Sequence, residues 1–222
     1  MRSSKRWTVA RSRSSRPTTL TWPAAVGNID CPITGPQLEI FQKLRESPQL
    51  YRFSYVDAHL LRGGQPSIAQ LADLEALGVT TIISLRKENS GITTAEKAEA
   101  HRLGLKFLHF PFYGIFGASR SFLESILEEM RDPANGMVYV HCQRGRDRSS
   151  LLVALHLVID HAWDPELAWR QAVLDYGYQT TFWYRRMRTD FEKMVAAHKK
   201  PSATESGAPS TGGSSQQTRD SS

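Results

Sequence analysis

The sequence has few cysteines and no long apolar run. Its 222 residues include only Cys31 and Cys142, so a secreted fold held by several disulfides is not expected and a reducing compartment suits the chain. No apolar stretch approaches the roughly 18 residues that a membrane-spanning helix needs. There is no internal repeat. With 40% hydrophobic and 23% charged residues, the composition is that of an ordinary globular protein, which we expect in the cytoplasm as a monomer.

Acidic residues are absent from the first 29 positions, where six Lys and Arg residues account for the whole net charge of +6. We expect residues 1–36 to form a disordered basic arm, because they are rich in Arg, Ser, Thr and Pro and show little periodicity. The arm also resembles an organelle transit peptide, and it could instead contact anionic lipid or nucleic acid. Residues 199–222 are rich in Ser and Gly and are expected to be a disordered tail.

The segment between these ends, 37–198, alternates strand and helix patterns. Apolar spacing predicts strands at 51–56, 59–62, 79–85, 105–110 and 137–140. It predicts helices starting near 37, 67, 93, 121, 150, 164 and 181. Ser67 with Gln70 fits a capping box, and Thr93 to Glu96 fits a helix start. This alternation predicts an α/β fold with a central, mostly parallel sheet flanked by helices on both faces.

The most informative stretch runs from Met137 to Ser150. An apolar run with two valines indicates a short buried strand, and an apolar helix follows Ser150. Cys142 therefore stands where a strand ends, and Arg148 stands where a helix begins. Helix N-termini present free N–H groups and a positive dipole, which bind anions and lower a thiol pKa from about 8.5 to roughly 3.5–7.5. The pattern predicts a pocket that binds an oxyanion and activates Cys142 as a nucleophile.

Two further features of the loop suit a phosphate. Gly145 lets the backbone curl tightly, and the Arg148 guanidinium has the geometry to donate two parallel bonds to phosphate oxygens. The segment His141–Ser149, HCQRGRDRS, resembles the phosphate loop of the protein tyrosine phosphatase superfamily, His-Cys-x-x-Gly-x-x-Arg followed by Ser or Thr. Every fixed position matches. The resemblance implies a cysteine-dependent protein tyrosine or dual-specificity phosphatase that forms a cysteinyl-phosphate intermediate.

The same resemblance implies roles for individual residues. Cys142 would attack phosphorus and Arg148 would stabilise the transition state. The Ser149 hydroxyl would assist loss of the thiolate, and His141 would hold the loop in shape. The substrate oxygens would be bound by backbone N–H groups of the loop, among them Gln143, Arg144, Gly145 and Arg146. The resemblance implies no metal and no other cofactor.

A second stretch supports the same family. Residues 61–86, LRGGQPSIAQLADLEALGVTTIISLR, resemble the N-terminal half of atypical dual-specificity phosphatases of the bacterial kind. In these proteins an Arg-x-Gly-Gln-Pro turn, a helix and an Ile-Ile-x-Leu-Arg strand recur. The two resemblances together cover roughly residues 51–194, so they are not a local coincidence, and they lie within the expected catalytic domain of 37–198.

The general acid departs from the family pattern. Many members carry an aspartate after the strand that corresponds to 105–110, but residues 111–119 contain no acidic residue. Asp147 is the best candidate, because some relatives have an aspartate at this loop position. The alternative is that Asp147 only caps the following helix. Loss of the acid altogether would favour good leaving groups, such as aryl or phosphoanhydride esters.

The substrate is predicted only as a class. Arg144 and Arg146 exceed what one phosphate requires, so an inositol polyphosphate or phosphoinositide is the alternative to a phosphorylated protein. Solvent-facing charge would also explain them. Phe112, Tyr113 and Phe116 either wall a cleft for a phosphotyrosine ring or belong to the core.

Two other functions remain open at this stage. The first is a catalytically inactive phosphate-binding module, suggested by the missing acid. The second is a rhodanese-like sulfurtransferase, against which Arg148 and Ser149 argue. Cys31 is expected to be a plain thiol, and a regulatory disulfide with Cys142 is conceivable.

Overall fold

The computed structural model describes residues 35–87, 91–113, 117–174 and 182–199. Nearly all of the predicted N-terminal arm and C-terminal tail, together with Cys31 and Phe116, lies outside the described residues. The domain boundaries at 36 and 198 therefore stay predictions. Within the described ranges, no helix combines the length and apolar character needed to cross a bilayer.

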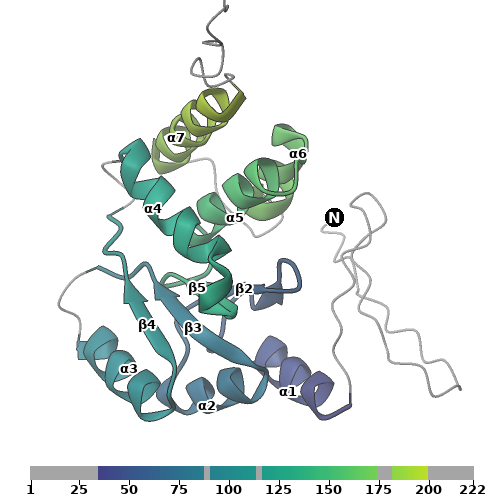
Figure 1. Cartoon of the computed structure of the whole chain (residues 1–222), viewed down its shortest axis with the longest axis vertical. Helices are drawn as coiled ribbons and strands as arrows, with labels where there is room; N and C mark the ends of the chain where they lie inside the picture. Colours follow the sequence, from purple (N-terminus) through teal and green to yellow (C-terminus); the bar gives the residue numbers. More distant parts are fainter. Residues whose placement is uncertain (1–34, 88–90, 114–116, 175–181, 200–222) are drawn as a thin grey trace, which may run out of the picture.

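Five strands form one sheet at the centre of the domain (Figure 1). The strands are β1 (Ser54–Tyr55), β2 (Leu60–Gly63), β3 (Val79–Ser84), β4 (Lys106–His109) and β5 (Met137–His141). Their order is β1-β2-β5-β3-β4, and only the short edge strand β1 is antiparallel to its neighbour. The predicted α/β fold with a mostly parallel sheet is confirmed.

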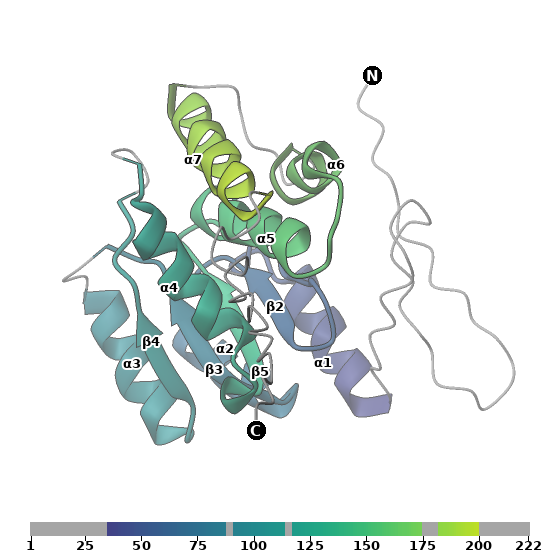
Figure 2. The same ribbon diagram turned by 45° about the horizontal axis from the view of Figure 1, so that its top comes forward.

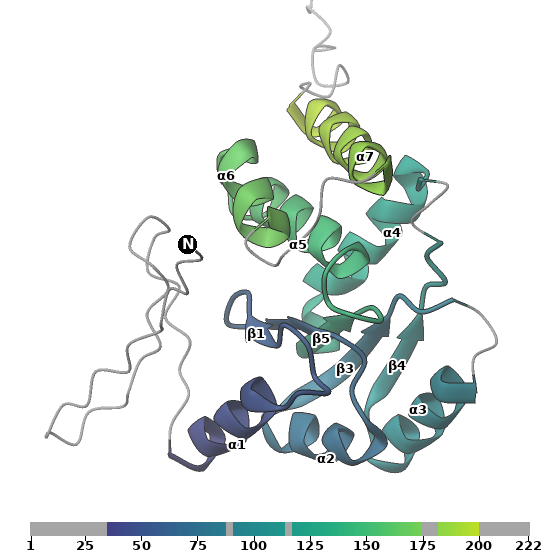
Figure 3. The same cartoon turned by 180° about the vertical axis from the view of Figure 1, so that it is seen from behind.

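Helices cover both faces of the sheet (Figure 2). One face carries α1 (Gly35–Glu46), α2 (Ile68–Ala76) and α3 (Gly91–Arg102), and the other carries α4 (Arg120–Arg131), α5 (Arg148–Ile159), α6 (Pro165–Trp169) and α7 (Phe182–Lys199). A 3-10 turn, η1 (Pro133–Asn135), precedes β5, and a π-helical turn, η2 (Arg170–Leu174), extends α6. In the sheet β5 lies between β2 and β3, and Figure 3 shows β5, β3 and β4 from behind.

Alternating residues of the inner strands supply two separate apolar cores. Ile82 and Tyr139 pack with the α1, α2 and α3 side, whereas Ile83, Val138 and Val140 pack with the α4 and α5 side. All five side chains are fully buried. A strand with both faces buried reads as a nearly continuous apolar run, which is why β3 and β5 were recognisable in the sequence.

The element boundaries confirm some local predictions and correct others. The Ser67 capping box is confirmed, because the Ser67 N–H donates to Gln70 Oε1 at 2.8 Å and the Gln70 N–H donates to Ser67 Oγ at 3.3 Å. The strand predicted for 51–56 is only two residues long. Arg52 has a positive φ of 59°, which an extended strand does not allow, so the chain turns before β1.

The predicted start of the third helix is also wrong. The helix already runs from Gly91, and both Thr93 and Glu96 are buried inside it. The helix before the phosphate loop begins at Arg120, where Ser119 is the N-cap and accepts from the N–H of Phe122 at 3.2 Å. Glu96 does not cap its own helix. Its side chain points into the interior and contacts His141 at the end of β5.

Candidate active site

The segment from His141 to Ser149 forms a loop between the end of β5 and the start of α5, as the sequence predicts. Gly145 has φ 61°, a left-handed conformation that side chains rarely adopt. A Cβ at this position would lie only 2.6 Å from the carbonyl carbon of Gly63 and 2.8 Å from the nitrogen of Gly64. Both contacts are with backbone, so the curl of the loop requires glycine here.

Cys142 lies at the floor of this loop with 2% of its surface exposed. Its Sγ is 3.5 Å from Ser149 Oγ. Burial works against the thiolate, but the charge of Arg148 and hydrogen bonds from Ser149 and from the backbone outweigh it and lower the pKa of Cys142 to about 7. A substantial fraction of this thiol is therefore the nucleophilic thiolate at neutral pH.

The Arg148 guanidinium is fixed by two carbonyls from other parts of the chain. Its Nη1 donates to Leu85 O at 2.6 Å, just after β3, and to Phe112 O at 3.0 Å, after β4. Both bonds use the same nitrogen, so they orient the planar guanidinium beside Cys142. An arginine held in this way needs little reorganisation when it binds an oxyanion, which is the basis of electrostatic catalysis.

The turn after β2, at Gly64 and Gln65, contacts the phosphate loop directly. The Gln65 N–H donates to Gln143 O at 3.2 Å, and Gly64 forms a β-bridge with Arg144. Tyr139 donates from its hydroxyl to Gly64 O at 2.6 Å. The two stretches that resemble the phosphatase family are thus in direct contact in the fold.

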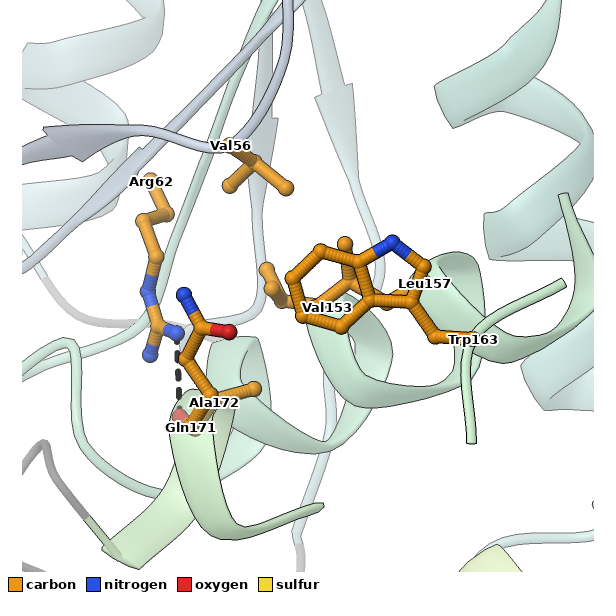
Figure 4. Close-up of a pocket in the computed structure, with 7 residues that line it drawn as sticks. All are labelled: Val56, Arg62, Val153, Leu157, Trp163, Gln171 and Ala172. Atoms are coloured by element: carbon orange, nitrogen blue, oxygen red, sulfur yellow. Dashed lines mark hydrogen bonds between the residues drawn. The ribbon is translucent and has the colours of Figure 1, made fainter. Parts of the chain in front are cut away.

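Arg62 holds the loop from behind and was not singled out in the sequence as a site residue. It is 1% exposed, and its guanidinium donates to Gly145 O at 3.0 Å, to Ala172 O at 2.9 Å and to the Ser150 hydroxyl. Figure 4 shows the bond to Ala172 beside a pocket whose other walls include Val56, Val153, Leu157 and Trp163. No residue of 142–149 lines this pocket, so it lies behind the loop and is not the substrate site.

His141 occupies the interior position expected for it and has a partner that the sequence did not reveal. Its Nε2 is 3.0 Å from Glu96 Oε1, and both side chains are fully buried. Tyr139 stacks on the His141 ring at 5.6 Å. Burial opposes the charge on Glu96, but His141 outweighs it and lowers the pKa of Glu96. The contact between these two side chains therefore links α3 to the end of β5 directly before Cys142.

Asp147 does not cap α5. It stands at the N-cap position, but its side chain makes no capping bond and instead accepts from Arg146 Nε at 2.9 Å. The interpretation of Asp147 as a helix cap is therefore wrong. About a third of the side chain is exposed, with a value of 36%, so the carboxyl group is accessible from the loop surface. Its role as a general acid stays a prediction.

The cationic surroundings of Cys142 are larger than the loop alone suggested. Burial and then the charge of Arg146 lower the pKa of Arg52, and burial and then the charge of Arg148 lower the pKa of Arg86. The Cys142 thiolate acts on both in the opposite direction. Arg52 also donates to Arg144 O at 3.2 Å. Arg52 comes from the turn before β1, and Arg86 follows β3 as the last residue of the Ile-Ile-x-Leu-Arg motif, but the sequence pointed to neither as a residue of the site.

The aromatic residues after β4 separate into two environments. Phe112 is 2% exposed and packs edge-on against Phe122 at 5.7 Å, so it belongs to the core. Tyr113 is 42% exposed, and Lys87 Nζ lies 5.8 Å from the centre of its ring. Of the aromatic wall considered in the sequence, only Tyr113 remains a candidate among the described residues.

Comparison with known proteins identifies the family. A model described as "DSP-PTPase phosphatase fused to NAD+ Kinase" matches residues 42–202. The chain belongs to this family of dual-specificity phosphatases. The predicted fold, enzyme class and superfamily are thereby confirmed, and the match covers the phosphate loop and the turn that supports it.

Individual proteins similar to this chain are also phosphatases by name or share its fold. The chain is 30% identical over 108 residues to "Inositol diphosphatase DSP1" of Oryza sativa subsp. japonica, and the match spans 46% of each protein. TpbA of P. aeruginosa has a similar fold, with a TM-score of 0.55, 18% identity and coverage of 70% of this chain and 99% of that one. The core catalytic domain of the PP-IP phosphatase SIW14 of S. cerevisiae has a TM-score of 0.51, 20% identity and coverage of 65% and 90%. At these identities the two structures show the fold alone.

Proposed function

We propose that this phosphatase hydrolyses a phosphate group of a small, multiply phosphorylated molecule of the inositol diphosphate class, through a phosphorylated Cys142. The observation that carries the proposal is the set of arginines around one thiolate, which exceeds what a single phosphate requires. The residues are Arg52, Arg86, Arg144, Arg146 and Arg148. Similarity to a protein named an inositol diphosphatase, and the fold shared with a PP-IP phosphatase, support the same class.

The chemistry follows from the loop. The Cys142 thiolate forms a sulfur–phosphorus bond while the phosphorus–oxygen bond to the leaving group breaks. Backbone N–H groups of the loop and the Arg148 fork hold the three other phosphate oxygens as charge shifts toward the leaving group. Water then attacks phosphorus, the sulfur–phosphorus bond breaks, and inorganic phosphate and the thiolate are released. Ser149, 3.5 Å from Sγ, is placed to donate to the departing sulfur.

A diphosphate suits a site with little general acid. When a phosphoanhydride is cleaved, the leaving group is itself a phosphate, which departs with less help from a proton than an alkoxide does. Residues 111–119 carry no acid, and Asp147 is paired with Arg146. Both facts favour a phosphoanhydride over an alkyl ester.

A phosphotyrosine protein is the second candidate. It is favoured by the exposed ring of Tyr113, which lies beside Lys87 and would stack on a substrate ring. The fold is also shared with TpbA, which has been crystallised with phosphotyrosine. A phenolate is a good leaving group as well, so a phosphotyrosine substrate would also react in a site that has little general acid catalysis.

A substrate panel separates the two candidates. Inositol diphosphates, inositol polyphosphates, phosphoinositides, and phosphotyrosine and phosphoserine peptides would be compared by phosphate release. We expect Cys142→Ser to lose at least about 10⁴-fold in kcat on every substrate, because it removes the nucleophile. Arg144→Ala should raise KM for an inositol diphosphate far more than for an aryl phosphate. Equal rates for wild type and Cys142→Ser would reject the proposal, and a higher kcat/KM for the phosphotyrosine peptide would select the second candidate.

A further inference from the structure

A second cluster of polar side chains lies at the opposite end of α5 from the phosphate loop. It consists of Asp57 in the β1–β2 loop, His156 in the last turns of α5, and His161 just beyond the helix. Asp57 and His156 are buried, whereas the His161 side chain is 35% exposed. The catalytic scheme uses none of the three.

The three side chains direct one atom each toward a common point. His156 Nε2 is 2.6 Å from Asp57 Oδ2, His161 Nε2 is 3.1 Å from the same oxygen, and the two nitrogens are 3.1 Å apart. The two imidazole rings are almost perpendicular, at 82°. These three atoms form a triangle. A proton on one nitrogen can bridge only two of the atoms, whereas a single metal ion would contact all three.

We propose that Asp57, His156 and His161 bind a divalent metal ion of the zinc class. Atoms at these separations lie on a circle of about 1.7 Å radius, so an ion at the zinc–ligand distance of about 2.0–2.1 Å from each would sit about 1 Å from their plane. Two imidazoles and one carboxylate are ligands that zinc commonly uses. The exposed side of His161 leaves the fourth position to water.

The groups behind the ligands hold them in this orientation. Asp57 Oδ1 accepts from the backbone N–H of His59 at 2.7 Å, which turns Oδ2 toward the imidazoles. His156 Nδ1 is 2.7 Å from Asp160 Oδ2, so its hydrogen is directed there and Nε2 faces the cluster. Arg131 lies 3.5 Å from the other oxygen of Asp160 and holds that carboxylate in place.

The local charge also favours a cation at this position. Two carboxylates, those of Asp57 and Asp160, lie within 2.6 Å and 2.7 Å of the His156 ring nitrogens, so negative charge gathers around the cluster. The C-terminal end of a helix carries the negative pole of its dipole, which attracts cations in the same way. An ion here would join the β1–β2 loop to the end of α5.

The site is testable with the full chain, free of tags, in a Cys31→Ser, Cys142→Ser background that removes both thiols. Zn²⁺ would be titrated by calorimetry, and Co²⁺ would be followed by its visible spectrum as a report on coordination geometry. We expect saturable one-to-one binding, an intense tetrahedral Co²⁺ spectrum and, at a hundredfold excess of Zn²⁺ over Kd, a rise in Tm of roughly 5 °C or more.

Two variants and one control connect the binding to these residues. His161→Ala removes a ligand at the surface and should abolish binding without unfolding the chain, and Asp160→Asn should weaken it about 10- to 100-fold. His101→Ala removes an exposed histidine of α3 and should change nothing. The proposal is overturned if the thiol-free chain shows no saturable binding, which would leave the cluster occupied by protons alone. It is equally overturned if His161→Ala binds as the parent does.

Discussion

The two ends of α5 carry opposite chemistry. At its first residue, Arg148, the helix meets the loop around Cys142 and a cluster of arginines, and at its last turn it meets Asp57, Asp160 and two histidines. The positive pole of the helix dipole lies at the anion site and the negative pole at the proposed cation site. The two ends differ in which contacts hold their residues in place. Contacts to the backbone of distant segments shape the anion end, whereas contacts between side chains form most of the other end, with one backbone N–H, that of His59, on Asp57.

The largest effect is expected at the anion-binding end of α5, from a substitution that keeps the positive charge of residue 148 and removes the planar guanidinium. Arg148→Lys cannot bind Leu85 and Phe112 with one nitrogen and still present a planar fork. We expect kcat to fall about 10²- to 10³-fold, the cost of losing one well-placed donor to a transition state. Steady-state kinetics on an aryl phosphate would measure this.

Arg144→Lys is the matched control for that substitution, because Arg144 is exposed on the same loop. Its kcat on the same aryl phosphate should stay within about tenfold of wild type. Equal losses in the two variants would show that Arg148 acts only through its charge.

A smaller effect tests how the anion end handles the leaving group. Asp147→Asn should reduce kcat about 100-fold on an alkyl phosphate, the lower range for a general acid, and much less on a phosphoanhydride. A plot of log kcat against leaving-group pKa would become steeper in the variant. A parallel plot for the two proteins would remove Asp147 from the role of acid.

The pH dependence of the thiol provides a finer test of the same end. Because the thiolate is the reactive form, kcat/KM should rise with pH and level off above the Cys142 pKa of about 7. Ser149→Ala removes a hydrogen bond that favours the thiolate, so the pKa should move up by roughly half a unit to one unit. Iodoacetamide alkylation against pH, in a Cys31→Ser background, measures this directly. An unmoved midpoint would show that backbone N–H groups and Arg148 suffice.

The smallest expected effect tests whether the two ends are independent. His161→Ala, in the wild-type background, should change kcat and KM for an aryl phosphate less than about twofold, since the residue is separated from Cys142 by the length of α5. The length of the helix, about 1.5 Å per residue over its 12 residues, sets that separation. A large loss of kcat would indicate that the cluster positions the phosphate loop through the helix.

Much of the fold and the centre of the site could be predicted because their signals are local. The apolar run of β5, the spacing of Cys142 and Arg148, and the capping box at Ser67 all lie within a few neighbouring residues. The contact between the loop and the turn at Gly63 and Gly64 was not predicted, because no periodicity in the sequence shows that two segments about 80 residues apart meet.

The residues that sequence analysis missed depend on long-range pairing. Glu96 looked like part of a helix start, yet it is the buried partner of His141, and its identity as such depends on α3 packing beside β5. Arg62 and Arg86 belong to the motifs that resemble the phosphatase family, but nothing in those motifs showed that either lies beside the phosphate loop, and no motif included Arg52. The alternative interpretation of Asp147 as a helix cap rested on its local position and was wrong, because its side chain accepts from Arg146 instead.

The way the phosphate loop is supported has a consequence for the newly synthesised chain. Arg62 reaches Gly145 across 83 residues, Arg52 reaches Arg144 across 92, and Leu85 receives Arg148 across 63. These contacts cannot form until both halves of the domain have been made and have docked. An incomplete chain would therefore hold Cys142 as an ordinary thiol, and full reactivity toward phosphate, and toward oxidants, would arise only when folding is finished.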